Sequence, residues 1–279
     1  MDDLLAKARD LVNQCKYKEA IECFKETLLV ATDDITTMIN IEMAHVYVYI
    51  EQFDTAMGIY TSCRDSAFKN NSDANLFMSL MGIGNIYHAQ QKFNEALSVY
   101  ELASRIPHSV NRAYYHRIRA TTLLAMGCNN AAKDQLNLAT NIVKYGIEQG
   151  RYFRIKGRIE HATWNNLCAW VYYCDAFMRM VNFRKGSYQN DETCGVLFDM
   201  VTLMLRKKKY RDDAMFLLRQ VYIVWVRTFG PHGHSKIEKV VKLFGDTVLP
   251  TEKNPVELAD VLAIIQTVDM RDEPCCNFQ

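Results

Sequence analysis

Histidines and cysteines are the side chains of this sequence that could bind a metal ion or act as nucleophiles. His232 and His234 flank Gly233, so two imidazoles stand close enough to contact one ion. A metal site in a protein needs three or four ligands, and no carboxylate or cysteine has a suitable spacing near this pair. Cys168 and Cys174 are six residues apart in an apolar stretch, where free cysteine behaves as a small apolar residue. These patterns predict a structural turn for the histidines, core positions for the cysteines and no metal.

Motifs of catalysis are absent from the sequence. The chain has no glycine-rich phosphate loop, no Gly-x-Ser-x-Gly elbow and no His-Glu-x-x-His metal motif, and its 7 histidines are spread thinly. We therefore expect a protein without enzymatic activity and without a cofactor.

Basic side chains are concentrated in the middle of the chain. Counting Lys and Arg against Asp and Glu, the net charge is −3 over residues 1–140, +8 over 141–240 and −4 over 241–279. A turn between helices is the expected place for the second basic cluster, because lysines suit the negative end of a preceding helix. The alternatives are a surface for an acidic ligand, a phosphate group or nucleic acid, or a nuclear localisation signal. The two basic clusters are Arg151, Arg154, Lys156 and Arg158, and the run from Arg206 to Arg211.

The last four residues could be a lipidation signal. Cys276-Asn-Phe-Gln279 has the Cys-a-a-X form that directs prenylation, and Cys275 could carry a palmitate. Two features count against lipidation: the first residue after Cys276 is polar, and the acidic residues before Pro274 oppose attachment to an anionic leaflet. One prenyl chain alone gives only marginal anchoring. The two hypotheses are a prenylated Cys276, if the chain is made in a eukaryotic cytosol, and an ordinary flexible tail.

Cysteine usage favours a reducing compartment. The 9 cysteines are an odd number scattered along the sequence, so they do not form a disulfide framework. No apolar run reaches the ~18 to 20 residues that cross a bilayer, and the start Met1-Asp-Asp-Leu-Leu5 lacks the basic and apolar regions of a secretory signal. We expect a cytoplasmic protein, with membrane association only through a prenylated Cys276 and a nuclear location as an alternative.

Evenly spaced alanines indicate which elements must position these side chains. Ala20, Ala56, Ala96 and Ala132 follow one another at intervals of 36, 40 and 36 residues. The first three alanines each follow an aromatic residue by three positions and precede another by four, which is one stripe of an α-helix. A period of this size is typical of stacked supersecondary units that cannot bury their apolar faces alone. Short turns separate each of these helices from a preceding amphipathic stretch, so each unit is a predicted helical hairpin.

The repeat resembles the tetratricopeptide repeat, and four copies in register cover roughly residues 1–145. This resemblance implies an all-α, right-handed α-solenoid of stacked helical hairpins, a fold that binds other proteins. The matching residues are Ala8, Tyr17, Ala20, Phe24 and Thr27 in the first copy; Ala44, Tyr47, Phe53, Ala56 and Tyr60 in the second; Gly84, Tyr87, Phe93, Ala96, Tyr100, Ala103 and Pro107 in the third; and Ala120, Leu123, Ala132, Leu136 and Ala139 in the fourth.

Residues 146–234 are expected to continue the stack with more divergent helices. His161–Phe183 has apolar residues at intervals of three and four, which predicts a long buried helix. A polar loop should follow at 184–191, and then a hairpin formed by Thr193–Arg206 and Arg211–Thr228.

The end of that hairpin is similar to a second kind of repeat. Its closing Phe229-Gly-Pro-His-Gly-His234 resembles the Gly-Pro-His turn of the longer repeats of kinesin light chains. Capping helices are predicted at Ser235–Val248 and Pro255–Val268, within residues 235–270, with a flexible tail at 271–279.

The resemblance also implies where a partner binds. In such a solenoid the first helix of each hairpin lines a concave groove. Apolar anchors alternate there with single polar groups, which suits an amphipathic helix or an extended peptide. The predicted partner-binding residues are Arg9, Met38, Ile41, His45, Tyr49, Met78, Met81, Asn85, His88, Tyr114, Arg117 and Thr121.

The predicted function is therefore that of a non-enzymatic adaptor or scaffold whose groove holds a segment of another protein. The alternatives are a regulatory sensor that responds to a peptide or ligand, a nucleic-acid-associated module that uses the basic residues of 141–240, and a prenylated, membrane-associated adaptor.

Overall fold

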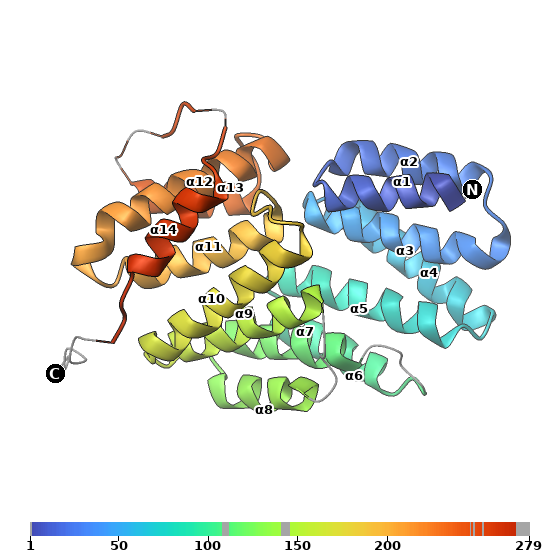
Figure 1. The fold of residues 1–279 in the computed structure, drawn as a ribbon. Helices are drawn as coiled ribbons and strands as arrows, with labels where there is room; N and C mark the ends of the chain where they lie inside the picture. Colours follow the sequence, from blue (N-terminus) through green and yellow to red (C-terminus); the bar gives the residue numbers. More distant parts are fainter. Residues whose placement is uncertain are drawn as a thin grey trace. The chain divides into compact units, whose positions relative to one another are not determined.

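The protein is described from a computed structural model that covers residues 2–107, 112–140, 146–245, 247, 249–252 and 254–271. These residues form fourteen α-helices and one short 3₁₀-helix and contain no strand (Figure 1). The predicted all-α fold is thus confirmed. The chain divides into two compact units, unit 1 (Met1–Ile142) and unit 2 (Val143–Gln279). Within the described ranges, none of the helices is both long and apolar enough to cross a bilayer.

Unit 1 is a stack of helical hairpins, drawn from blue to green in Figure 1. Consecutive helices pack against each other, and α3 also contacts α5, which in turn contacts α7. The first helices of successive hairpins therefore lie side by side as an inner layer. The helices are α1 (Asp2–Asn13), α2 (Tyr17–Leu29), α3 (Asp33–Tyr49), α4 (Phe53–Lys69), α5 (Asp73–Ala89), α6 (Phe93–Ser104), α7 (Arg112–Ala125) and α8 (Asn129–Thr140).

A residue in the left-handed conformation follows the first helix of each hairpin. Glu51, after α3, has φ +60° and donates its N–H to the carbonyl of Val48 at 3.1 Å. The N–H of Gln52 donates to the carbonyl of Tyr47 at 2.9 Å. This pair of bonds is the Schellman motif, which satisfies the last carbonyls of a helix and reverses the chain within a few residues. The same positive φ is found at Cys15, Gln91, Gly127 and Trp164.

Each hairpin of unit 1 has a small buried residue on its first helix and a bulky buried one sixteen positions later. In the third hairpin these residues are Gly84 and Tyr100, and a Cβ atom at Gly84 would lie 2.2 Å from the tyrosine ring. The helices can approach this closely only because one side chain is minimal. The other pairs of unit 1, all buried, are Ala8 and Phe24, Ala44 and Tyr60, and Ala120 and Leu136. The repeat alanines Ala20, Ala56, Ala96 and Ala132 are likewise fully buried.

Unit 2 begins with a hairpin that the sequence analysis divided differently. The predicted long helix at His161–Phe183 is interrupted, because Trp164 has φ +62° and Asn165 donates to the carbonyl of Glu160 at 2.9 Å. The prediction was therefore wrong about where this helix begins, and it missed the helix before it. The helices of unit 2 are α9 (Ile147–Ala162), α10 (Asn166–Phe183), α11 (Asp191–Met204), the 3₁₀-helix η1 (Lys208–Tyr210), α12 (Arg211–Phe229), α13 (Ser235–Phe244) and α14 (Leu258–Thr267).

The sixteen-residue pair also closes this hairpin of unit 2. A Cβ atom at Gly157 of α9 would lie 2.6 Å from the ring of Tyr173 on α10. Ala169, also on α10, is fully buried. Consecutive helices from α9 to α13 pack against each other, and α9 also contacts α11. The core of unit 2 is one cluster of buried residues contributed by α10, α11, α12, α13 and α14.

The last two helices are shorter than predicted. The helix from Ser235 ends at Phe244, because Gly245 has φ +58°. The helix expected from Pro255 begins at Leu258, since the N–H of Val256 is held by the side chain of Gln220 at 3.0 Å. The predicted tail at 271–279 lies outside the described residues from position 272 on.

Candidate functional site

The candidate site is the surface of α1, α3, α5 and α7 that carries the twelve predicted partner-binding residues, called here the inner-helix surface. Arg9 and Tyr49 are exposed, and seven residues are half-buried. Ile41 and Met81 are buried in the core, with 4% and 0% of their surface exposed, so they have little surface to offer a partner. Arg117 is also buried, at 9%. The half-buried members are Met38, His45, Met78, Asn85, His88, Tyr114 and Thr121.

Asn85 is the centre of a polar network on this surface. The hydroxyl of Tyr100, from the outer helix α6, donates to Asn85 Oδ1 at 3.0 Å. Asn85 Nδ2 donates to the hydroxyl of Tyr114 on α7 at 2.7 Å. The guanidinium of Arg117 lies over the Tyr114 ring, 5.2 Å from its centroid. The network connects two neighbouring hairpins and fixes the orientation of the Asn85 amide.

A second contact between α5 and α7 lies one turn further along. His88 Nδ1 is 2.9 Å from Thr122 Oγ1, and the His88 ring lies beside Phe93 at 5.5 Å between centroids. Thr121 donates its hydroxyl to the carbonyl of Arg117 at 3.0 Å. Polar groups on the inner-helix surface are thus largely committed to contacts within unit 1.

The second hairpin lacks the hydrogen bond that the third hairpin makes. His45 occupies on α3 the place that Asn85 has on α5, and Tyr60 occupies the place of Tyr100. The His45 ring meets the Tyr60 ring edge-on at 5.6 Å, and the buried Tyr60 hydroxyl has no hydrogen-bond partner among the described residues. Burial lowers the pKa of His45 to about 4, against a smaller opposing effect of Glu42, so the imidazole is neutral at pH 7.

An ion pair and a ring stack join the first two hairpins. Arg9 on α1 donates to both carboxylate oxygens of Glu42 on α3, at 2.8 and 2.6 Å. The hydrogen bond to Glu42 raises the pKa of Arg9. Tyr17 and Tyr49 stack with centroids 5.5 Å apart and planes 13° apart. This end of the inner-helix surface therefore carries an aromatic face and a charge pair that is neutral overall.

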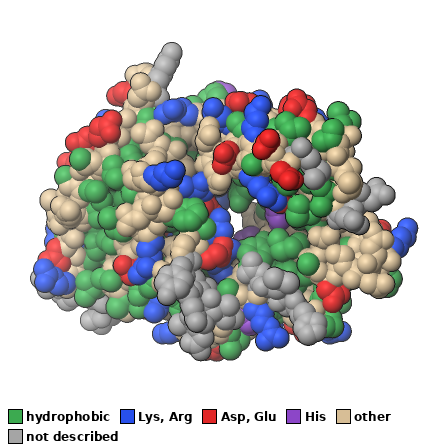
Figure 2. Space-filling model, turned by 45° about the vertical axis from the view of Figure 1, so that its right-hand side comes forward, with side chains coloured by type: hydrophobic (Ala, Val, Ile, Leu, Met, Phe, Trp, Pro, Cys, Tyr) green, Lys and Arg blue, Asp and Glu red, His purple; other side chains and the backbone are tan. Residues whose placement is uncertain are grey.

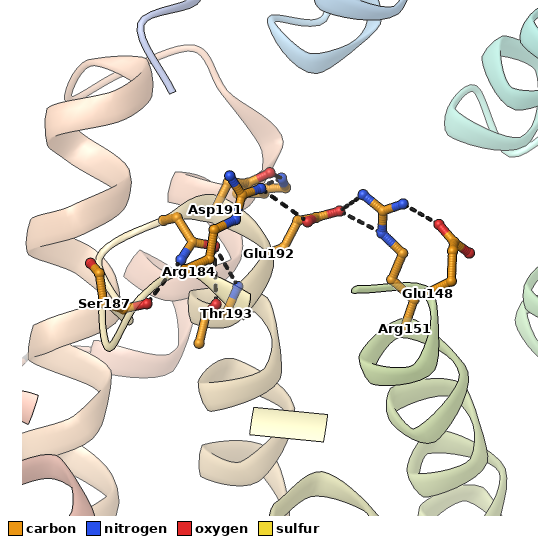
Figure 3. A network of polar contacts seen from close by, with 9 residues as sticks. Glu148, Arg151, Arg184, Ser187, Asp191, Glu192 and Thr193 are labelled. Carbon is orange, nitrogen blue, oxygen red and sulfur yellow. Dashed lines mark hydrogen bonds and ion pairs between the residues drawn. The ribbon is translucent and has the colours of Figure 1, made fainter. Parts of the chain in front are cut away.

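Acidic partners neutralise much of the first basic cluster, in unit 2. Arg151 lies between Glu148 and Glu192, and Arg184 approaches Glu192 from the other side at 3.5 Å (Figure 3). Arg154 donates to Asp199 at 2.6 Å and to the carbonyl of Gly195 at 2.8 Å. Figure 2 likewise shows Lys and Arg side chains interspersed with Asp and Glu on the face it displays. The remaining members of the cluster are Lys156, whose ammonium lies 4.4 Å from the Tyr172 ring centroid, and Arg158.

The second basic cluster lies at the predicted position between two helices. Arg206 stacks on Trp164 at 4.1 Å and donates to the carbonyl of His161 and to Asn166 Oδ1. Lys207 is only 6% exposed, and its ammonium has no hydrogen-bond partner among the described residues. Lys208 begins the 3₁₀-helix η1.

His234 has a structural role at the start of α13. His234 accepts a hydrogen bond from the N–H of Lys236 at 3.2 Å and so caps α13. Its ring stacks on Phe229 with centroids 3.8 Å apart. Among the residues that the structure describes, no three His, Cys, Asp or Glu side chains are grouped as metal ligands.

Cys168 and Cys174 are both half-buried on α10. Cys174 packs against the core of unit 2, and its burial raises the pKa of the thiol to about 12, which keeps it protonated at pH 7. Cys276 and the lipidation hypothesis built on it lie outside the described residues.

Comparison with known proteins supplies one family match and a set of similar folds. Residues 79–113 match the tetratricopeptide-repeat family model. No curated protein has a significantly similar sequence. Among solved structures, pilF of Pseudomonas aeruginosa is 16% identical with a TM-score of 0.48, and the alignment covers 87% of this chain and 96% of that one. A tetratricopeptide-repeat protein from Parabacteroides merdae is 12% identical with a TM-score of 0.46, over 95% and 98% of the two chains. The TPR2AB domain of yeast Sti1, in a complex with pHSP90, is 12% identical with a TM-score of 0.36, over 87% and 96%.

The matched segment, residues 79–113, includes most of α5 and all of α6, with the close contact between Gly84 and Tyr100. A small and a bulky buried residue, sixteen positions apart, recur in the other hairpins of unit 1, and Gly157 meets Tyr173 closely in the first hairpin of unit 2. The resemblance of the later hairpins to kinesin light chains stays a prediction. The chain thus contains a tetratricopeptide repeat at residues 79–113.

Proposed function

We propose that the protein is a non-enzymatic adaptor that binds a segment of a partner protein on the inner-helix surface of unit 1. The observation that carries this proposal is the side-by-side arrangement of α3, α5 and α7, which brings half-buried methionines and tyrosines from successive hairpins onto one layer. Methionine is unbranched and adapts to different partners, and tyrosine offers a large contact area with a polar tip.

The chemistry of this surface favours an uncharged apolar segment. Met38, Tyr49 and Met78 are available for apolar contact, while Arg9 and Glu42 neutralise each other. His45 is neutral at pH 7 because its pKa is lowered to about 4. A partner helix or extended peptide would therefore bind through apolar side chains laid across the inner helices.

Met78→Glu tests this proposal, because it places a charge in the middle of the surface. The matched control is Leu102→Glu, which changes an apolar residue that is 52% exposed on the outer helix α6. We expect proteins captured from a cell extract by the immobilised wild-type chain to be captured equally by the control and lost from Met78→Glu. With a purified captured partner, the loss should be at least about 10-fold in Kd, as for an apolar anchor worth more than 1.4 kcal/mol.

Thermal unfolding of both variants establishes that they fold. Equal capture by the wild-type chain and Met78→Glu would remove the inner-helix surface as the binding site. Loss of capture only in Leu102→Glu would move the site to the outer helices.

A cytoplasmic location is also part of the proposal, because the sequence favours a reducing compartment. The regulatory sensor and the prenylated, membrane-associated adaptor stay as alternatives. Cell fractionation and the mass of the purified protein would distinguish the prenylated adaptor from the other two. Unmodified protein in the soluble fraction would exclude the prenylated adaptor.

A further inference from the structure

We propose that unit 2 has a binding site of its own for a carboxylate of an acidic protein segment, formed by Arg158 on α9 and Arg206 just after α11. This inference is independent of the function proposed for unit 1, because it rests only on residues of unit 2.

Two facing helices of unit 2 carry a ladder of charges. On α11, Glu192 and Asp199 are seven residues apart, which places them on one face two helical turns apart, and Arg206 lies in the turn just after this helix. The matching stripe of α9 is formed by Arg151, Arg154 and Arg158, with spacings of three and four.

The first two rungs of this ladder are ion pairs. Arg151 Nε donates to Glu192 at 2.8 Å, and Arg154 Nε donates to Asp199 at 2.6 Å. The next arginine of α9 is Arg158, and Arg206 donates to the carbonyl of His161, three positions after it. Two cations, called here the third rung, therefore lie near the same end of α9, whereas the earlier rungs each have one cation and a carboxylate.

Neither arginine of the third rung has an acidic partner among the described residues. Arg158 is half-buried and makes no hydrogen bond or ion pair there. Arg206 is held by neutral groups: it donates to the carbonyl of His161 at 3.1 Å and to Asn166 Oδ1 at 3.0 Å, and it stacks on Trp164. Its guanidinium is thus positioned without being neutralised.

His161 lies close to both arginines, and its pKa responds to their charge. It lies three positions after Arg158, so the two side chains are neighbours on α9. His161 Nδ1 is 3.2 Å from the hydroxyl of Tyr173. Burial is the main reason that the pKa of His161 falls to about 4, with Arg206 and Arg158 lowering it further and Asp199 opposing them. The third rung is therefore a site of excess positive charge.

A carboxylate is the group that fits this site best. The planar fork of a guanidinium binds a carboxylate through paired, charge-assisted hydrogen bonds, and carboxylates already complete the two neighbouring rungs. Nucleic acid needs a series of available cations along its backbone, and Arg151 and Arg154 are already paired. The favoured ligand is thus an Asp or Glu side chain of a partner segment.

Fluorescence anisotropy with the full chain tests the site. The probes are a labelled nine-residue peptide of alternating glycine and glutamate, its glutamine counterpart, a phosphoserine counterpart and a nine-nucleotide thymidine strand. We expect the glutamate peptide to bind, more weakly as NaCl is raised from 50 to 300 mM, and the glutamine peptide not to bind. Arg158→Gln should weaken binding at least 10-fold, whereas the exposed Arg219→Gln on α12 should bind as the wild-type chain does.

A second variant gives a readout that needs no ligand. Arg158→Glu would turn the third rung into an ion pair with Arg206, so we expect it to raise Tm by about 2 °C or more and to abolish binding of the glutamate peptide. Arg219→Glu is its matched control and should not raise Tm.

Several results would overturn the proposal. These are no binding of the glutamate peptide up to 1 mM peptide, equal binding of the glutamine peptide, unchanged affinity in Arg158→Gln, or a lower Tm in Arg158→Glu. Binding of only the phosphoserine peptide or only the DNA strand would assign the site to phosphate and would also reject the carboxylate.

Discussion

Tyr60 and Tyr100 have the same place in consecutive hairpins but different hydrogen bonding. Tyr100 donates to Asn85, whereas the buried hydroxyl of Tyr60, next to His45, has no hydrogen-bond partner in the described part of the chain. Burial raises the pKa of both phenols, so both remain protonated donors at neutral pH. A buried donor without an acceptor costs about 1–3 kcal/mol. The identity of residue 45 therefore affects the stability of the second hairpin.

His45→Asn should stabilise the protein by about 1 kcal/mol, because an amide oxygen at this position can accept the Tyr60 hydroxyl as Asn85 accepts that of Tyr100. The reciprocal change, Asn85→His, should destabilise it by about 1–2 kcal/mol by leaving Tyr100 without its acceptor. Urea unfolding measures both. If the wild-type chain and both variants have the same free energy of unfolding, hydrogen bonds from the Tyr60 and Tyr100 hydroxyls to residues 45 and 85 do not contribute to stability.

Stability should fall as the pH is lowered from 7 to 5. The pKa values of His45 and His161 are lowered to about 4 in the folded protein, below the ~6.5 of an unfolded chain. The unfolded chain then binds more protons between these values, so stability is complete above about pH 6.5 and declines as the pH falls toward 4. We expect a loss of about 2 kcal/mol or more between pH 7 and pH 5 from the two histidines together.

The free energy of unfolding in urea at the two pH values measures this loss. A variant with both His45→Asn and His161→Gln should lose much less stability than the wild-type chain. An unchanged free energy in the wild-type chain would contradict the lowered pKa values.

At the scale of the helix pair, close approach depends on glycine. A Cβ atom at Gly84 would clash with the Tyr100 ring, whereas nothing lies within 4 Å of one at Gly58 on α4. Gly84→Ala should therefore destabilise the protein by about 1–3 kcal/mol through overpacking. Gly58→Ala is the control and should stabilise it by about 0.5–1 kcal/mol, because glycine is unfavourable inside a helix. A stable Gly84→Ala variant would show that the third hairpin opens easily.

The turns inside the hairpins carry a different constraint. Gln91, between α5 and α6, has φ +62°, a conformation that costs most residues energy but not glycine. Gln91→Gly should stabilise the protein by up to about 1 kcal/mol, and Gly127→Ala, at φ +78°, should destabilise it by a similar amount. Thermal unfolding should give a higher Tm for Gln91→Gly and a lower Tm for Gly127→Ala. A Tm shift of the same sign in both variants would contradict the left-handed conformation of these turns.

At the scale of the whole molecule, each unit buries a core of its own. The buried residues of the unit 2 core cluster run from Ala169 to Met270, with Phe153 packed against them, and two core clusters of unit 1 have buried residues from Ile41 to Tyr115. A fragment of residues 1–142 should therefore be helical and unfold cooperatively. A fragment of residues 1–125 lacks α8 and exposes its contact with α7, so it should be less stable by about 2 kcal/mol or more.

Circular dichroism during urea titration measures both fragments. A gradual, non-cooperative loss of helix in the fragment of residues 1–142 would mean that unit 1 does not fold by itself.

Local patterns in the sequence were sufficient for the hairpins of unit 1. Buried alanines spaced 36 to 40 residues apart, with aromatic residues at helical intervals, specify helices whose apolar stripes must meet. The turns between them are too short for any other connection. Helix period and chain connectivity are local properties, so a sequence determines them without knowledge of the packing.

Other features depended on which helix faces meet. Ile41 and Met81 fit the groove pattern but lie in the core, because an inner helix is covered on more than one side. Trp164 gave no signal of a chain reversal, since a left-handed turn is usually marked by glycine. The basic residues Arg151 and Arg154 were recognised in the sequence, but their partners on α11, Glu192 and Asp199, lie 41 and 45 positions away along the chain. Only the packing of α9 against α11 brings these charges together, and the same packing leaves Arg158 and Arg206 without an acidic partner among the described residues.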